Sequence, residues 1–151
     1  MTLGFTDPIP AFNDDGNLPP GIHVVKLEHV VRRFGGSMSL RRSQLTKSLR
    51  DFYNFAKYYA IEIYIDGSYI TEKVSPSDVD LLIILPADFP RNIPAYFRLM
   101  EFVSNNKGNK LHVFPYLIGA QDDEIDRLRE WFSHDRNRNQ KGIIKLETKN
   151  D

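Results

Sequence analysis

Cysteine is absent from the sequence, and neither sign of charge predominates. Without cysteine the chain can form no disulfide bond, thiolate metal site or cysteine nucleophile. Its 20 basic residues balance 20 acidic ones, so bulk electrostatic attraction to nucleic acid or to a membrane is not predicted. No apolar run approaches the length of a transmembrane helix, and the N-terminus lacks the basic start and apolar core of a signal peptide. We therefore expect a cytoplasmic protein with no membrane partner and no sequence-specific binding to DNA.

The chain has 151 residues, 41% of them apolar, which is enough for one domain with a buried core. Residues 1–22 are rich in proline, glycine, asparagine and aspartate, and this composition predicts an irregular N-terminal arm. Apolar residues at helical spacing predict a short helix over 23–36 and a longer one over 39–59, so that 23–60 forms a helical N-terminal region. The expected organisation is a single domain, 1–151.

The rest of the chain alternates between strand and helix patterns. The segment 79–85 is almost continuously apolar, which is typical of an inner strand covered on both faces. Pro115 lies within another strand-like segment and favours an edge position for it. The predicted strands cover 61–66, 79–85, 111–118 and 143–147, and the predicted helices cover 94–105 and 122–133. This order predicts an α+β fold, in which helices flank one mixed β-sheet.

Two aspartates stand at the start of the apolar segment 79–85, where carboxylates are unfavourable without a compensating charge. Residues two apart on a strand project to the same side, so Asp78 and Asp80 point together. Two adjacent carboxylates repel, and a divalent cation relieves that repulsion. Magnesium typically takes one or two protein carboxylates and completes its shell with water and substrate phosphate. Gly67 and Ser68 end the preceding strand and can cradle a phosphate through backbone amides and a hydroxyl.

The stretch "GSYITEKVSPSDVDLLI" resembles the signature of the polymerase-β-like nucleotidyltransferase superfamily, in which a Gly-Ser turn after one strand is followed by Asp-x-Asp within the next apolar strand. The resemblance implies a minimal nucleotidyltransferase fold. It also implies that Gly67 and Ser68 bind the triphosphate of a nucleoside triphosphate, and that Asp78 and Asp80 bind Mg²⁺ or Mn²⁺. Tyr69, directly after the turn, could stack on the base of that nucleotide.

The superfamily normally has a third carboxylate on a later strand, where it helps to activate the attacking group. The matching position, in "LHV", holds His112. Histidine can take a proton, but imidazole is a poor ligand for magnesium. Neutral imidazole can nevertheless bind other metals, so His112 is either a working residue, as a catalytic group or a metal ligand, or the mark of a vestigial site. Asp66 or Glu62 could supply the missing carboxylate, and Asp66, directly before the turn, is the better candidate.

Two hypotheses of function come from this resemblance. The first is a metal-dependent nucleotidyltransferase that moves a nucleoside monophosphate from a nucleoside triphosphate to a hydroxyl on protein or RNA. The alternative is a catalytically weakened binding or regulatory module, which could act with a partner protein in a toxin–antitoxin or phage-defence system. The segments "FNDDGNLPPGIH" and "KGIIKL" are similar to small bacterial nucleotidyltransferase-like proteins of an uncharacterised family.

Basic residues predict two polar surfaces outside this motif. The predicted helix over 39–59 carries one group, which is either a solvated face or a contact surface for RNA or an acidic partner. Its members are Arg41, Arg42, Lys47 and Arg50. The connector 134–141 is expected to be a polar loop, with contact to nucleotide phosphate or nucleic acid as the alternative.

Overall fold

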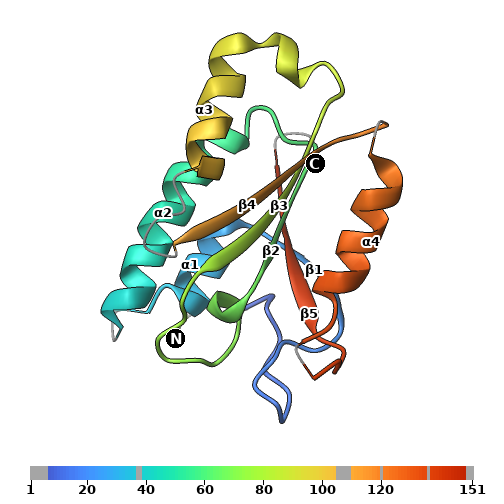
Figure 1. Ribbon diagram of the computed structural model, residues 1–151. Coiled ribbons are helices and arrows are strands. Elements are labelled where there is room, and N and C mark those ends of the chain that lie inside the picture. The colour runs from blue at the N-terminus through green and yellow to red at the C-terminus, as the bar shows by residue number, and fades with distance from the viewer. Residues whose placement is uncertain (1–6, 37–38, 105–109, 120, 136, 149–151) are drawn as a thin grey trace.

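The computed structural model describes residues 7–36, 39–104, 110–119, 121–135 and 137–148. Within these ranges the chain has four α-helices and five β-strands, and the strands form one mixed sheet that does not close into a barrel (Figure 1). In chain order the elements are β1 (Gly21–Val25), α1 (Leu27–Phe34), α2 (Leu40–Ala56), β2 (Glu62–Asp66), β3 (Val79–Leu85), α3 (Ile93–Ser104), β4 (Leu111–Leu117), α4 (Asp122–Phe132) and β5 (Gly142–Leu146). The predicted α+β fold is confirmed.

The sheet has the strand order β1-β5-β2-β3-β4, which places β3 between β2 and β4. β2 runs antiparallel to β3, and β4 runs parallel to it. Every residue of β3 except Asp80 is buried, as expected for the inner strand that its apolar sequence predicts. β4 forms one edge of the sheet, which agrees with the edge position that Pro115 favours.

Helices cover both faces of the sheet, and two separate apolar clusters result. α1, α2 and α3 lie on one face and α4 lies on the other (Figure 1). On the first face, the apolar side of α2 packs onto the inner strands through residues that include Leu45, Leu49, Phe52, Ile65 and Leu81. On the second face, the α4 cluster consists of Ile125 and Phe132 with Tyr64, Leu82, Ile84 and Ile143. None of the helices in the described ranges is long and apolar enough to cross a membrane.

The predicted helix over 23–36 is wrong at its start, where the structure has the edge strand β1. β1 pairs in parallel with β5, more than a hundred residues later in the chain, and His23 stands opposite Ile144. This long-range pairing, together with the β-branched Val24 and Val25, overrides the helical spacing. The helix α1 begins only after Lys26, which is its N-cap.

The described part of the N-terminal arm, residues 7–20, is irregular but packs onto the body of the protein. Ile9 and Leu18 are buried in the larger apolar cluster. Arg33 of α1 holds the arm through an ion pair with Asp7 at 3.1 Å and through a hydrogen bond to the carbonyl oxygen of Ile9 at 3.0 Å. Residues 1–6 of the predicted arm lie outside the described ranges.

Candidate metal and phosphate site

Three polar side chains lie in a row across the central strands. Asp80 of β3 is the register partner of Asp66 on β2 and also of His112 on β4. Directly opposed residues on neighbouring strands project to the same face of the sheet. That face is the one covered by α4, because Tyr64, two residues before Asp66, belongs to the α4 cluster. The row therefore follows the α4 cluster on the same face of the sheet, next to its members Tyr64 and Leu82.

Asp78, Asp80 and His112 converge closely enough to share one cation. The Nδ1 atom of His112 lies 3.2 Å from Oδ2 of Asp78 and 3.4 Å from Oδ1 of Asp80. One ligand atom from each residue lies within 4.8 Å of the other two. The three side chains are 20%, 23% and 39% exposed in chain order, so the cluster is partly buried and still reachable from solvent. Two carboxylates and one imidazole make a donor set that can hold a divalent cation.

The electrostatic surroundings of Asp80 favour a positive charge. The pKa of Asp80 is raised to about 6, chiefly by burial and further by the neighbouring carboxylates of Asp78 and Asp66, although His112 and Lys141 act in the opposite direction. A carboxyl group with a raised pKa is one whose negative charge is poorly compensated. A divalent cation between Asp78 and Asp80 would supply that compensation, and the residues present therefore fit the metal that the resemblance implies.

The Gly-Ser turn lies directly beside this cluster. Gly67 has φ +92°, and a Cβ atom at this position would stand 3.1 Å from Oδ2 of Asp80 and 3.3 Å from its Cγ. Only glycine combines that backbone conformation with so close an approach to a carboxylate. Ser68 follows at the start of a short 3₁₀ helix (Ser68–Ile70), and its Oγ is buried without a hydrogen-bond partner among the described residues. An unpaired buried hydroxyl is unfavourable, and a phosphate oxygen is a group that could accept its hydrogen bond.

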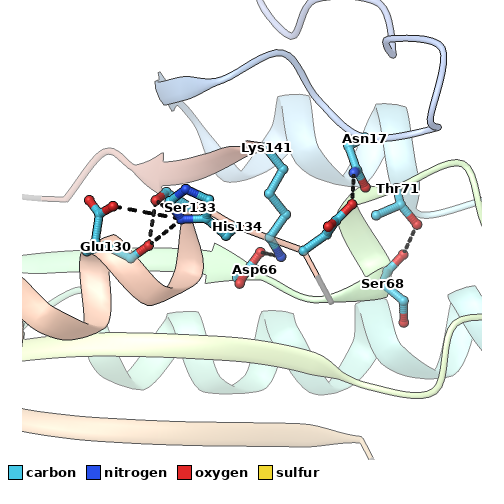
Figure 2. Close-up of polar contacts among 9 residues, drawn as sticks. Asn17, Asp66, Ser68, Thr71, Glu130, Ser133, His134 and Lys141 are labelled. Atoms are coloured by element: carbon cyan, nitrogen blue, oxygen red, sulfur yellow. Dashed lines mark hydrogen bonds and ion pairs between the residues drawn. The ribbon is translucent and has the colours of Figure 1, made fainter. Parts of the chain in front are cut away.

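The buried carboxylate of Asp66 forms an ion pair with the partly buried Lys141 next to Asp80. The Nζ atom of Lys141 lies 2.6 Å from Oδ1 of Asp66, and Figure 2 shows its side chain reaching down to the β2 carboxylate. Their side chains are only 4% and 13% exposed, for Asp66 and Lys141 respectively. Burial raises the pKa of Asp66 even though Lys141 lowers it. Lys141 was not singled out from the sequence. It directly precedes β5, and only the folded arrangement of the strands brings it to Asp66 at the end of β2.

The other substitute carboxylate, Glu62, is at the opposite end of β2, where its register partner is Ile84. Its Oε2 accepts a hydrogen bond from Nη2 of Arg129 at 2.8 Å and another from the hydroxyl of Tyr64. The structure therefore corrects the expectation for Glu62, which serves to join α4 to the sheet. Of the two alternatives, only Asp66 lies beside the aspartate pair.

Tyr69 has a core position that differs from its predicted contact with a nucleotide base. Its side chain is completely buried, its hydroxyl lies 2.7 Å from Oγ1 of Thr46, and its ring packs against Phe34 at a centroid distance of 6.0 Å. A nucleotide base cannot stack on a ring that has no exposed surface. The prediction for Tyr69 is therefore corrected, and the residue instead anchors the turn to α2.

Arg42 is likewise not a solvated or RNA-contacting residue. It is buried, and its guanidinium donates hydrogen bonds to the backbone carbonyl oxygens of Tyr69 at 2.7 Å, Thr71 at 2.8 Å and Lys73 at 3.1 Å. Neighbouring Arg41 donates to the carbonyl oxygens of Pro76, at 3.2 Å, and of Ser77. The two arginines thus shape the loop that joins the Gly-Ser turn to the aspartate pair. Lys47 and Arg50 remain exposed on α2.

The connector 134–141 is held by local hydrogen bonds in its described part. The carboxylate of Asp135 accepts hydrogen bonds from the backbone amides of Asn137 and Asn139, both at 2.9 Å, and from the side-chain amide of Asn17 at 3.2 Å. Figure 2 shows this connector beside the Asp66–Lys141 pair. The expected polar loop is present, and its final residue, Lys141, is the one that enters the site.

These features define a class of protein: an α+β fold whose sheet carries an aspartate–aspartate–histidine cluster beside a glycine–serine turn. Residues 10–147 match the model of DUF6932, a family of unknown function, and the chain belongs to that family. No curated protein and no solved structure shows significant similarity to this chain. The family membership assigns no activity, so a functional proposal depends on the site itself.

Proposed function

We propose that this protein is a metal-dependent nucleotidyltransferase, which moves a nucleoside monophosphate from a nucleoside triphosphate to a hydroxyl group on a protein or an RNA. The observation that carries the proposal is the approach of Gly67 to the carboxylate of Asp80. A turn suited to a phosphate and a carboxylate cluster suited to a cation are thereby adjacent, which is the arrangement that phosphoryl and nucleotidyl transfer require.

Each part of the site has a distinct role in this proposal. Asp78 and Asp80 hold Mg²⁺ or Mn²⁺, which when bound neutralises phosphate charge. The backbone at Gly67 admits the triphosphate, because no side chain blocks it, and the Ser68 hydroxyl donates a hydrogen bond to a phosphate oxygen. The acceptor oxygen bonds to the α-phosphorus, the bond from that phosphorus to the bridging oxygen breaks, and pyrophosphate leaves while the hydroxyl proton passes to solvent.

A binding or regulatory module without transfer activity is the second candidate. It is favoured by the presence of His112 at the third acidic position and by the ion pair that engages Asp66 with Lys141. In such a module the nucleotide and cation would bind, but no free carboxylate would activate the acceptor. The partner of such a module, for example in a toxin–antitoxin or phage-defence pair, would be a second protein.

Isothermal titration with a non-hydrolysable nucleoside triphosphate, in the presence of Mg²⁺ or Mn²⁺, tests nucleotide binding. We expect binding that depends on the cation and is lost in Asp78→Asn and Asp80→Asn. Asp51→Asn, an exposed position in the middle of α2, serves as the control and should bind as the wild type does. Absence of binding, or equal binding by the site variants, would refute the proposal.

Transfer from a nucleoside triphosphate labelled on its α-phosphate separates the two candidates. Incorporation of label into the protein or into added RNA by the wild type supports the transferase. If only His112→Asp transfers the label, the natural site is a weakened one and the regulatory module is supported.

A further inference from the structure

We propose that His112 is the third ligand of the cation site and that it makes the site selective for a first-row transition metal, such as manganese, over magnesium. This inference rests on the cation site of the proposed function, although not on nucleotidyl transfer itself. It assigns His112 the role of a direct metal ligand, and not that of a proton-accepting catalytic residue or of a residue left in a vestigial site.

The two separations from the imidazole nitrogen to the carboxylate oxygens match those of ligands on one ion. Two donors that each lie about 2.1 Å from an ion are ~3.0 Å apart at a right angle and ~3.4 Å apart at the tetrahedral angle. Nδ1 of His112 lies 3.2 Å from the nearer oxygen of Asp78 and 3.4 Å from that of Asp80. An ion can therefore enter between these three atoms with only small side-chain adjustments.

The orientation of the imidazole also suits a ligand. His112 and Asp80 are register partners on adjacent parallel strands, so the backbone fixes their spacing. The ring of Phe114 meets the imidazole edge-on at a centroid distance of 6.4 Å. A metal-bound histidine commonly donates its other ring N–H to a carboxylate, a carbonyl or water. With a side chain that is 39% exposed, His112 can make that hydrogen bond to water through Nε2.

No carboxylate in the described site competes for the place of the imidazole. Asp66 is the other acidic group in the row, and Lys141 already occupies one of its oxygens at 2.6 Å. Asp66 is also outside the group of residues whose ligand atoms converge. The third protein ligand is therefore nitrogen, with carboxylate oxygen from Asp78 and Asp80 as the other two.

A nitrogen ligand changes which cation the site prefers. Magnesium takes oxygen ligands in strict octahedral geometry and gains little from imidazole. First-row transition metals accept imidazole together with carboxylates, and their affinity for such sites rises from manganese toward copper. A neutral imidazole as the third ligand also supplies no negative charge, so the site attracts magnesium less strongly than three carboxylates would.

Metal titration of the full chain, without nucleotide, tests this assignment. We expect the wild type to bind Mn²⁺ about tenfold or more tightly than Mg²⁺. His112→Asp should lower this ratio severalfold by strengthening Mg²⁺ binding, and His112→Ala should weaken Mn²⁺ binding about tenfold or more. His134→Ala, at a histidine whose imidazole contacts Ser133 and Glu130 instead of the aspartate pair, is the matched control and should bind both ions as the wild type does.

Electron spin-echo spectroscopy of the wild type with Mn²⁺ provides a readout that needs no variant. Coupling of the manganese electrons to an imidazole nitrogen, lost in His112→Asp, supports the assignment. Absence of nitrogen coupling, or an unchanged Mn²⁺ affinity in His112→Ala, overturns it. Nitrogen-coupled Mn²⁺ in a protein that binds no nucleotide would refute the proposed function alone. Nucleotide binding with Mg²⁺ that is indifferent to His112 would refute this inference alone.

Discussion

Gly67 lies so close to Asp80 that a methyl group on Gly67 would stand 3.1 Å from the Asp80 carboxylate oxygen Oδ2. The two residues come from neighbouring strands, since Gly67 directly follows Asp66, the register partner of Asp80. This contact joins the turn proposed to bind phosphate to the carboxylates proposed to bind a cation. A substitution at Gly67 therefore affects both functions.

The Gly67→Ala variant should lose cation-dependent nucleotide binding. The added methyl group displaces the Asp80 carboxylate, and the backbone at φ +92° is strained for any residue with a Cβ. We expect stability to fall by about 1–3 kcal/mol and nucleotide affinity to fall at least tenfold, measured by urea denaturation and by isothermal titration.

Gly119→Ala separates the effect of backbone strain from the effect of displacing the Asp80 carboxylate. Gly119 has φ +88°, but an added Cβ would have no neighbour within 4 Å. This control should show a comparable backbone penalty with nucleotide binding intact. Equal losses of binding in both variants would show that the contact with Asp80 is irrelevant to the site.

The stability of the metal-free protein should depend on the ionisation of Asp80. Its pKa is about 6 in the folded chain and 3.8 without the fold. Because the folded state holds the proton more tightly, the protonated group stabilises the fold at low pH, and this contribution disappears as the pH rises through about 6. Asp80→Asn should therefore stabilise the metal-free chain by about 1–2 kcal/mol at pH 7.5 and by much less at pH 4.5.

Denaturation curves at these two pH values, recorded with a chelator, measure the effect. Addition of Mn²⁺ at pH 7.5 should stabilise the wild type, because the cation compensates the negative charge of the Asp80 carboxylate. The stability of Asp80→Asn, which lacks that charge, should not change. A stabilisation by Asp80→Asn that is equal at both pH values would contradict this assignment of the pKa.

Arg42 should be essential for the loop between the turn and the aspartate pair. Lysine carries the same charge but lacks the planar set of donors that the guanidinium directs to three carbonyl groups of the loop and to that of Phe34. Arg42→Lys is expected to lower the free energy of unfolding by about 2–3 kcal/mol because buried carbonyl oxygens lose their partners. Hydrogen exchange should also accelerate in residues 70–77.

Lys47→Ala is the appropriate comparison for Arg42. Lys47 lies on the same helix but is exposed, so its loss should change stability by about 0.5 kcal/mol or less. If Arg42→Lys behaves like Lys47→Ala, the carbonyl contacts do not stabilise the loop.

The sequence predicted the elements whose patterns are strong and local. The continuous apolar run of β3 indicated an inner strand, Pro115 indicated an edge, and the Gly-Ser and Asp-x-Asp spacing indicated one site. β1 was missed because its partner β5 is remote in the chain, and local spacing there resembles a helix. Pairing of that kind depends on tertiary contacts, which override local propensity.

Polar residues were harder to place from sequence than apolar ones. Arg41 and Arg42 stand in a basic run on a helix, which usually means a solvated face. Their hydrogen bonds to residues 69–77 depend on where that loop crosses the helix, and nothing in the local pattern records the crossing. Lys141 was missed for the same reason. A lysine before a strand becomes informative only when a buried carboxylate is known to face it.

The Asp66–Lys141 pair allows a test in which the two single substitutions and the double substitution give different results. Removal of one partner leaves the other buried and unpaired, which typically costs about 3–5 kcal/mol. Asp66→Asn and Lys141→Met should therefore each destabilise the fold strongly. Asp66→Asn/Lys141→Met should be more stable than the sum of the two effects predicts, by about 1–3 kcal/mol.

The pH dependence of Lys141→Met distinguishes a true ion pair from lost packing. Burial already raises the pKa of Asp66, and Lys141 is the largest influence that lowers it. Without Lys141 that pKa rises further, so the folded chain protonates Asp66 more readily and the destabilisation should be smaller at pH 5 than at pH 8. Urea denaturation at both pH values measures this difference. A loss of stability that is independent of pH, together with additive single substitutions, would mean that Lys141 acts through its aliphatic chain alone and exerts no electrostatic influence on Asp66 or Asp80.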